Sequence, residues 1–332
     1  MIRIAILLLS FVAAQVPSFP RGAAEVAADK VSAPKPPAAA QQLLALIGEY
    51  GPETAPVYVF EQSGKLWSIV DRGEAAPVAL TAFSKTLDAR GHSTSVTIKG
   101  TSYPYREVGP ADGGQLRVTP LRPVPEILEE SLKQSPPMEA GDFWPADLIE
   151  LTKLDPSIHL DIRYATTNNF LGSKFYGEAR AFMQRPAAEA VTKAAKALKP
   201  LGYGLLVHDG YRPWYVTKTF WEATPQEKKW LVADPSKGSK HNRGCAVDLT
   251  LYDLKTGRVI EMPSTYDEST PRAFAFYPGG TGLQRWHRAL LRRVMEAQGF
   301  AVNHEEWWHF DYKDWQHYGI GNVVFDRIGA PK

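Results

Sequence analysis

The chain of 332 residues contains a single cysteine, Cys245, and this count limits the possible folds more than any other feature of the sequence. A disulfide scaffold and a thiolate zinc site both need several cysteines, so both are excluded. With 44% hydrophobic residues, the chain can instead bury ordinary apolar cores. At about 150 residues per domain, the length predicts two folded units. Any bound metal must therefore be held by histidines and carboxylates.

The charged residues are nearly balanced. The 38 Lys and Arg residues stand against 36 Asp and Glu residues, which gives a formal net charge of +2. A nucleic-acid binder or an acidic solvating tail needs a surface of one sign, and this balance argues against both. We therefore expect no nucleic-acid partner.

The N-terminus has the pattern of an export signal. Arg3 precedes an apolar run at 4–13, and the small residues at 12–14 offer a cleavage site. The run is shorter than the ~20 residues that span a bilayer, so we expect no membrane span. A buried N-terminal helix is the alternative. We expect residues 1–14 to be a signal peptide and 15–40 an Ala/Pro-rich tether, on an exported, soluble protein that is periplasmic or secreted.

Residues 41–120 are predicted to form a small β-rich accessory module. Two strand-like runs, at 57–60 and 65–70, flank Ser63-Gly64, which is a hairpin signal. Further strand-like runs follow at 93–99, 101–103 and 115–118. Nothing in this part pairs a nucleophile with a base, since His92 stands alone. We expect the module to have a packing or wall-contact role.

A proline-rich stretch at 121–146 predicts a linker, because proline cannot continue a helix or a central strand. The unit that follows, residues 147–332, mixes helices and strands. Helices are predicted at 187–198 and at 283–298, and a short buried strand at 205–207. These elements do not alternate regularly and no phosphate-binding glycine loop is present. The pattern favours an α+β fold over a doubly wound sheet.

The first segment that carries chemistry is residues 239–251. Strand-like alternation places Asp248 on the face opposite to the large apolar side chains. A carboxylate inside an apolar strand is costly unless it is paired or bound to a cation. His241 precedes it in a polar loop that can turn the imidazole towards the carboxylate, and zinc accepts both kinds of ligand. A structural Asp248 paired with Arg243 or Arg258 is the alternative.

The second segment is residues 304–310. His304 and His309 cannot easily bind one metal, because they lie about 140° apart in a helix and on opposite faces in a strand. Glu306 and His309 share a face on a helical turn, whereas the two tryptophans between them favour a strand. We therefore expect a bulge or a tight bend here. A packed aromatic edge without ligands is the alternative.

Together the two segments meet the requirements of a catalytic zinc site. Such a site needs three protein ligands, an open position for water, and a carboxylate to take the proton of that water. His241, Asp248 and His309 supply the three ligands, and Glu306 supplies the base. A third segment, residues 209–213, holds Arg212 on a sharp loop, where its guanidinium can bind an oxyanion or a substrate carboxylate.

These motifs resemble the D-alanyl-D-alanine dipeptidases of the vancomycin-resistance type, zinc enzymes of the D,D-peptidase superfamily with a Hedgehog-like fold. The likeness rests on residues 239–248 and 306–309, and extends to 161–172 and 209–213. It implies a zinc dipeptidase domain at 147–332 and says little about the first 140 residues. The implied activity is hydrolysis of the D-Ala-D-Ala dipeptide to free D-alanine by a zinc-activated water with a glutamate as general base.

Carried over by position, the resemblance implies one zinc ion on His241, Asp248 and His309, with Glu306 as general base. It implies that Arg212 stabilises the charge on the attacked carbonyl oxygen. It also implies a substrate pocket lined by Tyr164, Ser239 and Asp267, in which Asp267 faces the substrate's ammonium group. Cys245 stands where the family has a small residue, and its alternation predicts a core position.

Two other functions stay open. One is a D,D-carboxypeptidase or endopeptidase that trims peptidoglycan stem peptides, which export would suit. The other is a non-catalytic wall-binding protein with a structural zinc, in which the base at Glu306 should be missing. The partner is therefore expected to be a small dipeptide or a stem peptide. The sequence gives no oligomeric state.

Overall fold

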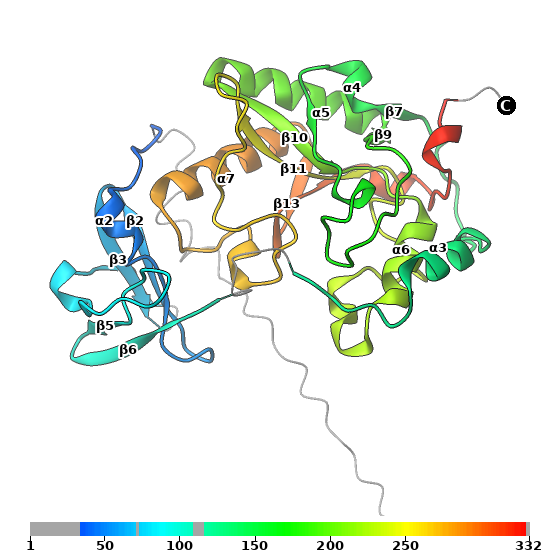
Figure 1. Cartoon of the computed structure of the whole chain (residues 1–332). Helices are drawn as coiled ribbons and strands as arrows, with labels where there is room; N and C mark the ends of the chain where they lie inside the picture. Colours follow the sequence, from blue (N-terminus) through cyan, green and yellow to red (C-terminus); the bar gives the residue numbers. More distant parts are fainter. Residues whose placement is uncertain (1–33, 71–72, 109–115, 330–332) are drawn as a thin grey trace, which may run out of the picture.

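The computed structural model describes residues 34–70, 73–108 and 116–329 (Figure 1). The predicted signal peptide at 1–14 and most of the predicted tether lie outside these ranges. Within them, no helix is long and apolar enough to cross a membrane. Helices and strands are mixed, and the strands form two larger sheets and one small pair.

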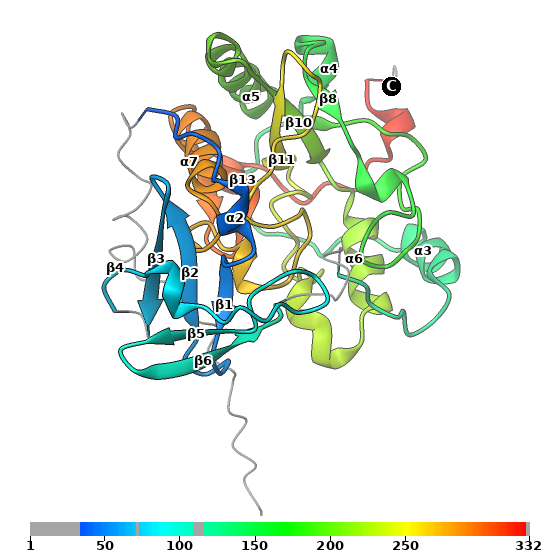
Figure 2. The ribbon, with the colours of Figure 1, turned by 60° about the vertical axis from the view of Figure 1, so that its left-hand side comes forward.

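The N-terminal sheet is antiparallel and has the strand order β4-β3-β2-β1-β6-β5 (Figure 2). Its elements are α2 (Gln41–Leu44), β1 (Gly48–Tyr50), β2 (Val57–Gln62), β3 (Lys65–Val70), β4 (Ala76–Pro77), η1 (Leu80–Ala82), β5 (Ser95–Ile98) and β6 (Thr101–Arg106). The predicted hairpin at Ser63-Gly64 is confirmed, because both residues have positive φ angles of 52° and 76°, as a two-residue turn between twisted strands requires.

The main sheet has the order β12-β13-β11-β10-β8, in which β8 runs parallel to β10 and the other neighbours are antiparallel. Its strands are β8 (His159–Leu160), β10 (Tyr203–Asp209), β11 (Ala246–Asp253), β12 (Phe300–Asn303) and β13 (Glu306–Tyr312). A separate antiparallel pair consists of β7 (Leu148–Glu150) and β9 (Phe182–Gln184).

Helices pack around the main sheet. They are α3 (Val124–Leu132), α4 (Leu151–Leu154), η2 (Arg163–Ala165), α5 (Arg185–Leu198), η3 (Lys199–Leu201), α6 (Trp214–Ala223), η4 (Gln226–Leu231), η5 (Pro271–Ala273), α7 (Gly282–Glu296), η6 (Trp315–His317) and η7 (Phe325–Arg327). Helices α5 and α7 confirm the two predicted helices and contact each other beside the sheet. The core-facing side of β11 includes Val247 and Leu249, and Cys245, which directly precedes the strand, lies in the same core. All three are fully buried, so the predicted core position of Cys245 is confirmed.

The stretch predicted as a linker contains a helix, which the prediction missed. Helix α3 begins at Val124 with Pro125 in its first turn, where the missing N–H of proline costs no helical hydrogen bond. Val124 and Ile127 are buried in the main core, and α3 packs on α6. The strand predicted at 115–118 is also wrong for its described residues: Val118 forms no strand but donates its N–H to Phe170 O at 2.8 Å and joins the same core.

Candidate metal centre

The register of β11 and β13 places two predicted ligands side by side. The strands pair so that Asp248 lies directly opposite His309. Directly opposite residues in an antiparallel pair point to the same face of the sheet, so their side chains meet. The Oδ1 atom of Asp248 lies 3.0 Å from Nδ1 of His309. Asp248 is 3% exposed, on the face opposite to that of Val247.

An irregularity in β13 brings Glu306 to the same place. The pairing with β12 shifts between Val302, which faces Phe310, and Asn303, which faces Glu306. A regular strand would send Glu306 and His309 to opposite faces, whereas the extra residues let Glu306 Oε2 approach His309 Nδ1 to 3.6 Å. The bulge or bend predicted from the sequence is therefore confirmed.

A tight turn before β11 supplies His241. The turn at residues 239–244 is closed by hydrogen bonds such as Asn242 N–H to Ser239 O (3.0 Å) and Gly244 N–H to His241 O (3.0 Å). Gly244 has a φ of +67°, a conformation that favours glycine. His241 is 4% exposed, and its Nε2 lies 3.2 Å from His309 Nδ1 and 3.5 Å from Asp248 Oδ1.

The three donor atoms fit a metal ion. Their separations are 3.0, 3.2 and 3.5 Å. Donors bound at about 2.0–2.1 Å in a tetrahedral zinc site lie about 3.3 Å apart, so the triangle already has the size that zinc requires. Among the described residues, His241, Asp248 and His309 are the one group of His, Cys, Asp and Glu side chains that could hold a metal. We call these three residues the donor triangle.

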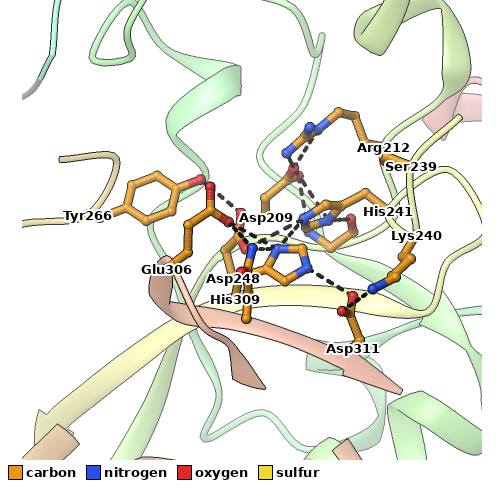
Figure 3. A network of polar contacts seen from close by, with 12 residues as sticks. Asp209, Arg212, Ser239, Lys240, His241, Asp248, Tyr266, Glu306, His309 and Asp311 are labelled. Atoms are coloured by element: carbon orange, nitrogen blue, oxygen red, sulfur yellow. Dashed lines mark hydrogen bonds and ion pairs between the residues drawn. The ribbon is translucent and has the colours of Figure 1, made fainter. Parts of the chain in front are cut away.

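Each member of the donor triangle has a second partner that fixes its orientation (Figure 3). His241 Nδ1 lies 2.7 Å from Gly210 O, and His309 Nε2 lies 2.9 Å from Asp311 Oδ1. These acceptors hold the protons of the rings and leave His241 Nε2 and His309 Nδ1 free to bind a metal. Tyr266 donates its hydroxyl to Asp248 Oδ2 at 3.1 Å.

The environment of the site shifts the pKa values of its carboxyl groups. Protein atoms displace solvent around Glu306 and raise its pKa, although 40% of its side chain stays exposed. A raised pKa suits a base that works near neutral pH. Burial, followed by the charges of Asp248 and Glu306, raises the pKa of Asp267 to about 7. Burial opposes ionisation of Asp248 as well, but His241 and His309 outweigh it and hold its pKa well below the usual range.

Arg212 lies beside the donor triangle and is fixed from behind. Its Nε and Nη2 atoms donate to Asp209 Oδ2 at 2.9 and 2.8 Å, and its guanidinium lies over the rings of Tyr164 and Phe220. Asp209 also accepts from Tyr176 Oη at 2.8 Å. Arg212 is only 9% exposed, so its direction is set by these contacts rather than by solvent.

The residues expected to line a substrate pocket come from three separate segments. Tyr164 in η2 donates to Asp267 Oδ2 at 3.3 Å, across 103 positions of sequence. Asp267 has a φ of +60°, unusual for a residue with a side chain. Ser239 begins the turn that carries His241, and its Oγ accepts from Asn242 N–H at 3.3 Å. The structure thus brings Tyr164 and Asp267 into contact and gives Ser239 a local role in the turn.

Three residues that contact this centre were given no role by sequence reasoning: Asp209, Tyr266 and Asp311. Asp311 follows His309 by two positions in a strand, so the alternation could have placed it on the same face. Tyr266 had no such signal, because its contact with Asp248 depends on the path of a long loop. His208 stacks on Tyr266 at 4.3 Å between ring centroids.

A buried His–Asp–His triangle with a glutamate and a guanidinium beside it defines the site of a metal-dependent hydrolase. Comparison with known proteins gives the family. A family model described as D-ala-D-ala dipeptidase matches residues 145–325. The chain therefore belongs to the D-Ala-D-Ala dipeptidase family of metallopeptidases, as the motifs predicted.

Individual relatives agree with this assignment. The chain is 32% identical to the D-alanyl-D-alanine dipeptidase of Escherichia coli (strain K12), over 50% of this chain and 84% of that protein. It is 36% identical to the D-alanyl-D-alanine dipeptidase of Enterococcus faecium, over 50% of this chain and 93% of that protein. It is 32% identical to the D-alanyl-D-alanine dipeptidase of Streptomyces coelicolor, over 53% of this chain and 94% of that protein. These relatives are thus matched over most of their length by about half of this chain.

Proposed function

We propose that the protein is a zinc-dependent dipeptidase that hydrolyses D-Ala-D-Ala to two molecules of D-alanine. The observation that carries this proposal is the donor triangle, whose separations of 3.0 to 3.5 Å suit zinc, with Glu306 3.6 Å from one of its members. The printed names of the relatives, all D-alanyl-D-alanine dipeptidases, support the choice of substrate.

His241, Asp248 and His309 would hold the zinc ion. Two imidazole nitrogens and one carboxylate oxygen form a donor set that zinc accepts, and three protein ligands leave a position open. When bound there, zinc supplies Lewis-acid chemistry, because it polarises a carbonyl group and makes a water molecule more acidic.

The residues around the donor triangle supply the other catalytic groups, which are a general base and a donor to the carbonyl oxygen. Glu306 accepts the proton of the water that attacks the peptide carbonyl carbon, and then returns it to the amine that leaves. Arg212, which Asp209 holds in place, donates to the carbonyl oxygen as negative charge develops there. Because this guanidinium is already fixed, little reorganisation is needed when the charge forms.

Recognition of the substrate is assigned to Asp267, Tyr164 and Ser239. Asp267 would face the ammonium group of a dipeptide, and the hydroxyl of Tyr164 would hold the carboxylate of Asp267 in position. Ser239 would line the pocket beside His241. A carboxylate reserved for a free amino group favours a dipeptide over the interior of a longer stem peptide.

The remaining parts of the proposal concern the chain as a whole. We assign residues 1–14 to a signal peptide, 15–40 to a tether, 41–120 to an accessory module, 121–146 to a connector and 147–332 to a catalytic domain of Hedgehog-like fold. An apolar N-terminal run with a positive start supports export to the periplasm or the exterior.

The test of this function is the variant Glu306→Gln in the zinc-loaded protein. We expect it to keep one zinc per chain and to lose about 10³-fold in kcat on D-Ala-D-Ala, because the amide cannot accept the proton. The neighbouring Glu305→Gln is the matched control, since Glu305 is exposed, and its activity should stay within about twofold.

The substrate range is measured on the wild-type chain. Hydrolysis of D-Ala-D-Ala that stops when a chelator is added supports the proposal. Release of D-alanine from a pentapeptide stem, with the free dipeptide left intact, would replace it with a carboxypeptidase. No hydrolysis of either peptide by a zinc-loaded chain would indicate a structural metal.

A further inference from the structure

Strand β2 of the N-terminal sheet is buried on both faces. Along β2, Val57 and Val59 pack into the core of the sheet's own unit, whereas Tyr58 and Phe60 point the other way. That second face packs against Tyr277, whose ring meets Tyr58 edge-on at 5.8 Å. Tyr277 belongs to residues 263–281, which lie between β11 and α7 and end directly before α7. We call this segment the pocket loop, because it carries Tyr266 and Asp267.

Two buried carboxylates of the N-terminal sheet hold the far end of the pocket loop. Glu49 in β1 accepts from Tyr277 Oη at 3.0 Å and also pairs with Arg106 of β6. Glu61 in β2 accepts from Gly282 N–H at 2.8 Å, at the first turn of α7. Both glutamates are 2% exposed. A carboxylate is rarely buried unless its partners are fixed, so these contacts define the position of the loop end.

Arg285 completes the contact between the N-terminal sheet and the end of the pocket loop from the side of α7. We call these contacts of Glu49, Glu61 and Arg285 the junction. It is 1% exposed and donates to Gly280 O at 2.8 Å and to Glu61 O at 2.7 Å, with its guanidinium over the ring of Phe60. The backbone also joins here, since Glu61 N–H donates to Gly280 O at 3.2 Å. Strand β2, the loop end and the start of α7 therefore form one connected unit.

Within the pocket loop, a second network leads from this junction to the pocket. Glu268 is 2% exposed and accepts from Arg272 Nε at 2.7 Å and from Thr265 N–H at 3.2 Å. Between these partners lies Asp267 with its φ of +60°. A non-glycine residue in this conformation is strained and persists only where its surroundings fix it. The neighbouring Tyr266 reaches Asp248 of the donor triangle.

We propose that the N-terminal module is a positioning part of the peptidase pocket, which fixes the pocket loop through Glu49 and Glu61 and so sets the preference for substrates with a free amino group. This inference rests on the proposed dipeptidase function. The module lies outside the region that the family model matches, which begins at residue 145. Glu49 and Glu61 act through Tyr277 and Gly282 and are positioning residues.

The test compares Tyr277→Phe and Glu61→Gln with the control Glu107→Gln. Tyr277→Phe removes only the hydroxyl that Glu49 binds. Glu107 is a glutamate of the same module that is 48% exposed and paired with Arg90, so it takes no part in the contacts with the pocket loop. In zinc-loaded Tyr277→Phe and Glu61→Gln, but not in Glu107→Gln, KM for D-Ala-D-Ala should rise about 5- to 20-fold, with kcat changed less than about threefold. The preference for D-Ala-D-Ala over N-acetyl-D-Ala-D-Ala should fall, and the zinc content should stay the same.

Amide hydrogen exchange at residues 264–270 gives a readout that does not depend on activity. Exchange there should accelerate in Tyr277→Phe and in Glu61→Gln, but not in Glu107→Gln. Unchanged exchange and unchanged KM in Tyr277→Phe would overturn the inference. If the wild-type enzyme itself leaves D-Ala-D-Ala intact, the proposed function fails, and the exchange result still decides whether the module holds the loop. Should Glu61→Gln fail to fold, Tyr277→Phe alone decides.

Discussion

His309 is oriented by a carboxylate on the side that faces away from the donor triangle. Asp311 Oδ1 lies 2.9 Å from His309 Nε2, and Asp311 Oδ2 accepts from Lys240 Nζ at 2.5 Å. Such a carboxylate fixes the tautomer of a metal-binding imidazole and increases its basicity. Lys240, which lies between Ser239 and His241 in the turn, thus contacts the carboxylate that orients His309.

The variant Asp311→Asn should bind zinc about 10- to 100-fold more weakly, because His309 loses its charged acceptor. Competition with a chelating dye measures the affinity. Lys240→Met is the control: it leaves the Asp311–His309 contact in place and should change the affinity by less than about threefold. Equal zinc affinity in Asp311→Asn and wild type would show that Asp311 does not orient the ligand.

His287 makes the stability of the fold depend on pH. It is 5% exposed in α7, with Nε2 2.9 Å from Tyr203 Oη. Burial, with a smaller effect of Lys35, lowers its pKa to about 4. The unfolded chain therefore takes up this proton first as pH falls. The contribution of His287 to the stability of the fold is complete above about pH 6.5 and is lost as pH falls towards 4. The stability lost by pH 5 is at most about 2 kcal/mol.

This prediction is checked by urea unfolding of the zinc-free protein near pH 7.5 and near pH 5. His287→Gln should lose about 2 kcal/mol less than wild type between the two conditions. His317→Gln, at an exposed histidine, should lose as much as wild type does. Identical pH dependence in His287→Gln and wild type would exclude His287 as the source.

At the scale of elements, the turn at 239–244 limits where His241 can lie. A Cβ atom on Gly244 would come 2.6 Å from Leu148 Cδ2 and 3.3 Å from Gln184 Cγ, in a backbone with φ +67°. Gly244→Ala should therefore destabilise the fold by about 1–3 kcal/mol and weaken zinc binding, because the turn must move. Gly257→Ala is a matched control, since Gly257 has φ +70° with nothing within 4 Å of its Cβ position.

Gly257→Ala should show the cost of the backbone conformation alone and leave zinc affinity unchanged. Urea unfolding and zinc titration of both variants separate the two effects. If Gly244→Ala binds zinc as tightly as Gly257→Ala does, the turn adapts without moving His241, and the prediction is wrong.

The elements that carry the donor triangle could be predicted from the sequence, although their details could not. Alternation placed Asp248 correctly, and the conflict between two tryptophans and a Glu–His pair predicted the irregularity of β13. A second irregularity, where the pairing of β10 with β11 shifts between Val207 and Asp209, left no such signal. The register shift depends on which strand pairs with β10, and a single sequence does not identify the strands that pair.

Two errors have the same physical origin, which is that local propensity does not reveal tertiary contacts. The prolines at 121–146 were taken to exclude a helix, yet Pro125 lies in the first turn of α3, where proline is well accommodated. The run at 115–118 has the alternation of a strand, but Val118 packs in the main core beside Phe170. In both cases burial against distant residues decided the structure.

At the scale of the whole molecule, the N-terminal sheet is not independent of the rest. Residues 57–60 are all buried, and a sheet with one solvated face would show alternation instead. The sequence therefore carried a sign of a second partner, but not its identity. Tyr277 and Arg285 lie more than 200 positions away from Glu49 and Glu61.

Because of this junction, we expect the zinc-loaded chain to unfold in one transition. Separation of the two parts would remove Tyr277 from Glu49 and the Gly282 N–H from Glu61, and would take the Glu61 carbonyl from Arg285, which disfavours a half-folded state. A ligand that binds only the folded state stabilises the whole cooperative unit, by about 4 kcal/mol when free zinc is about 1,000 times its Kd. Removal of zinc should therefore lower the unfolding temperature of the N-terminal sheet together with that of the metal site.

Calorimetry combined with temperature-dependent hydrogen exchange checks this expectation. Residues 57–70 and 246–253 should lose protection at the same temperature, and a chelator should shift both by the same amount. Arg285→Met keeps an unbranched apolar side chain at this position but removes the hydrogen bonds to Gly280 and Glu61, and should separate the two transitions. A transition of residues 57–70 that does not respond to the chelator in the wild-type chain would show that the sheet folds alone, and that its contact with the pocket loop does not couple it to the metal.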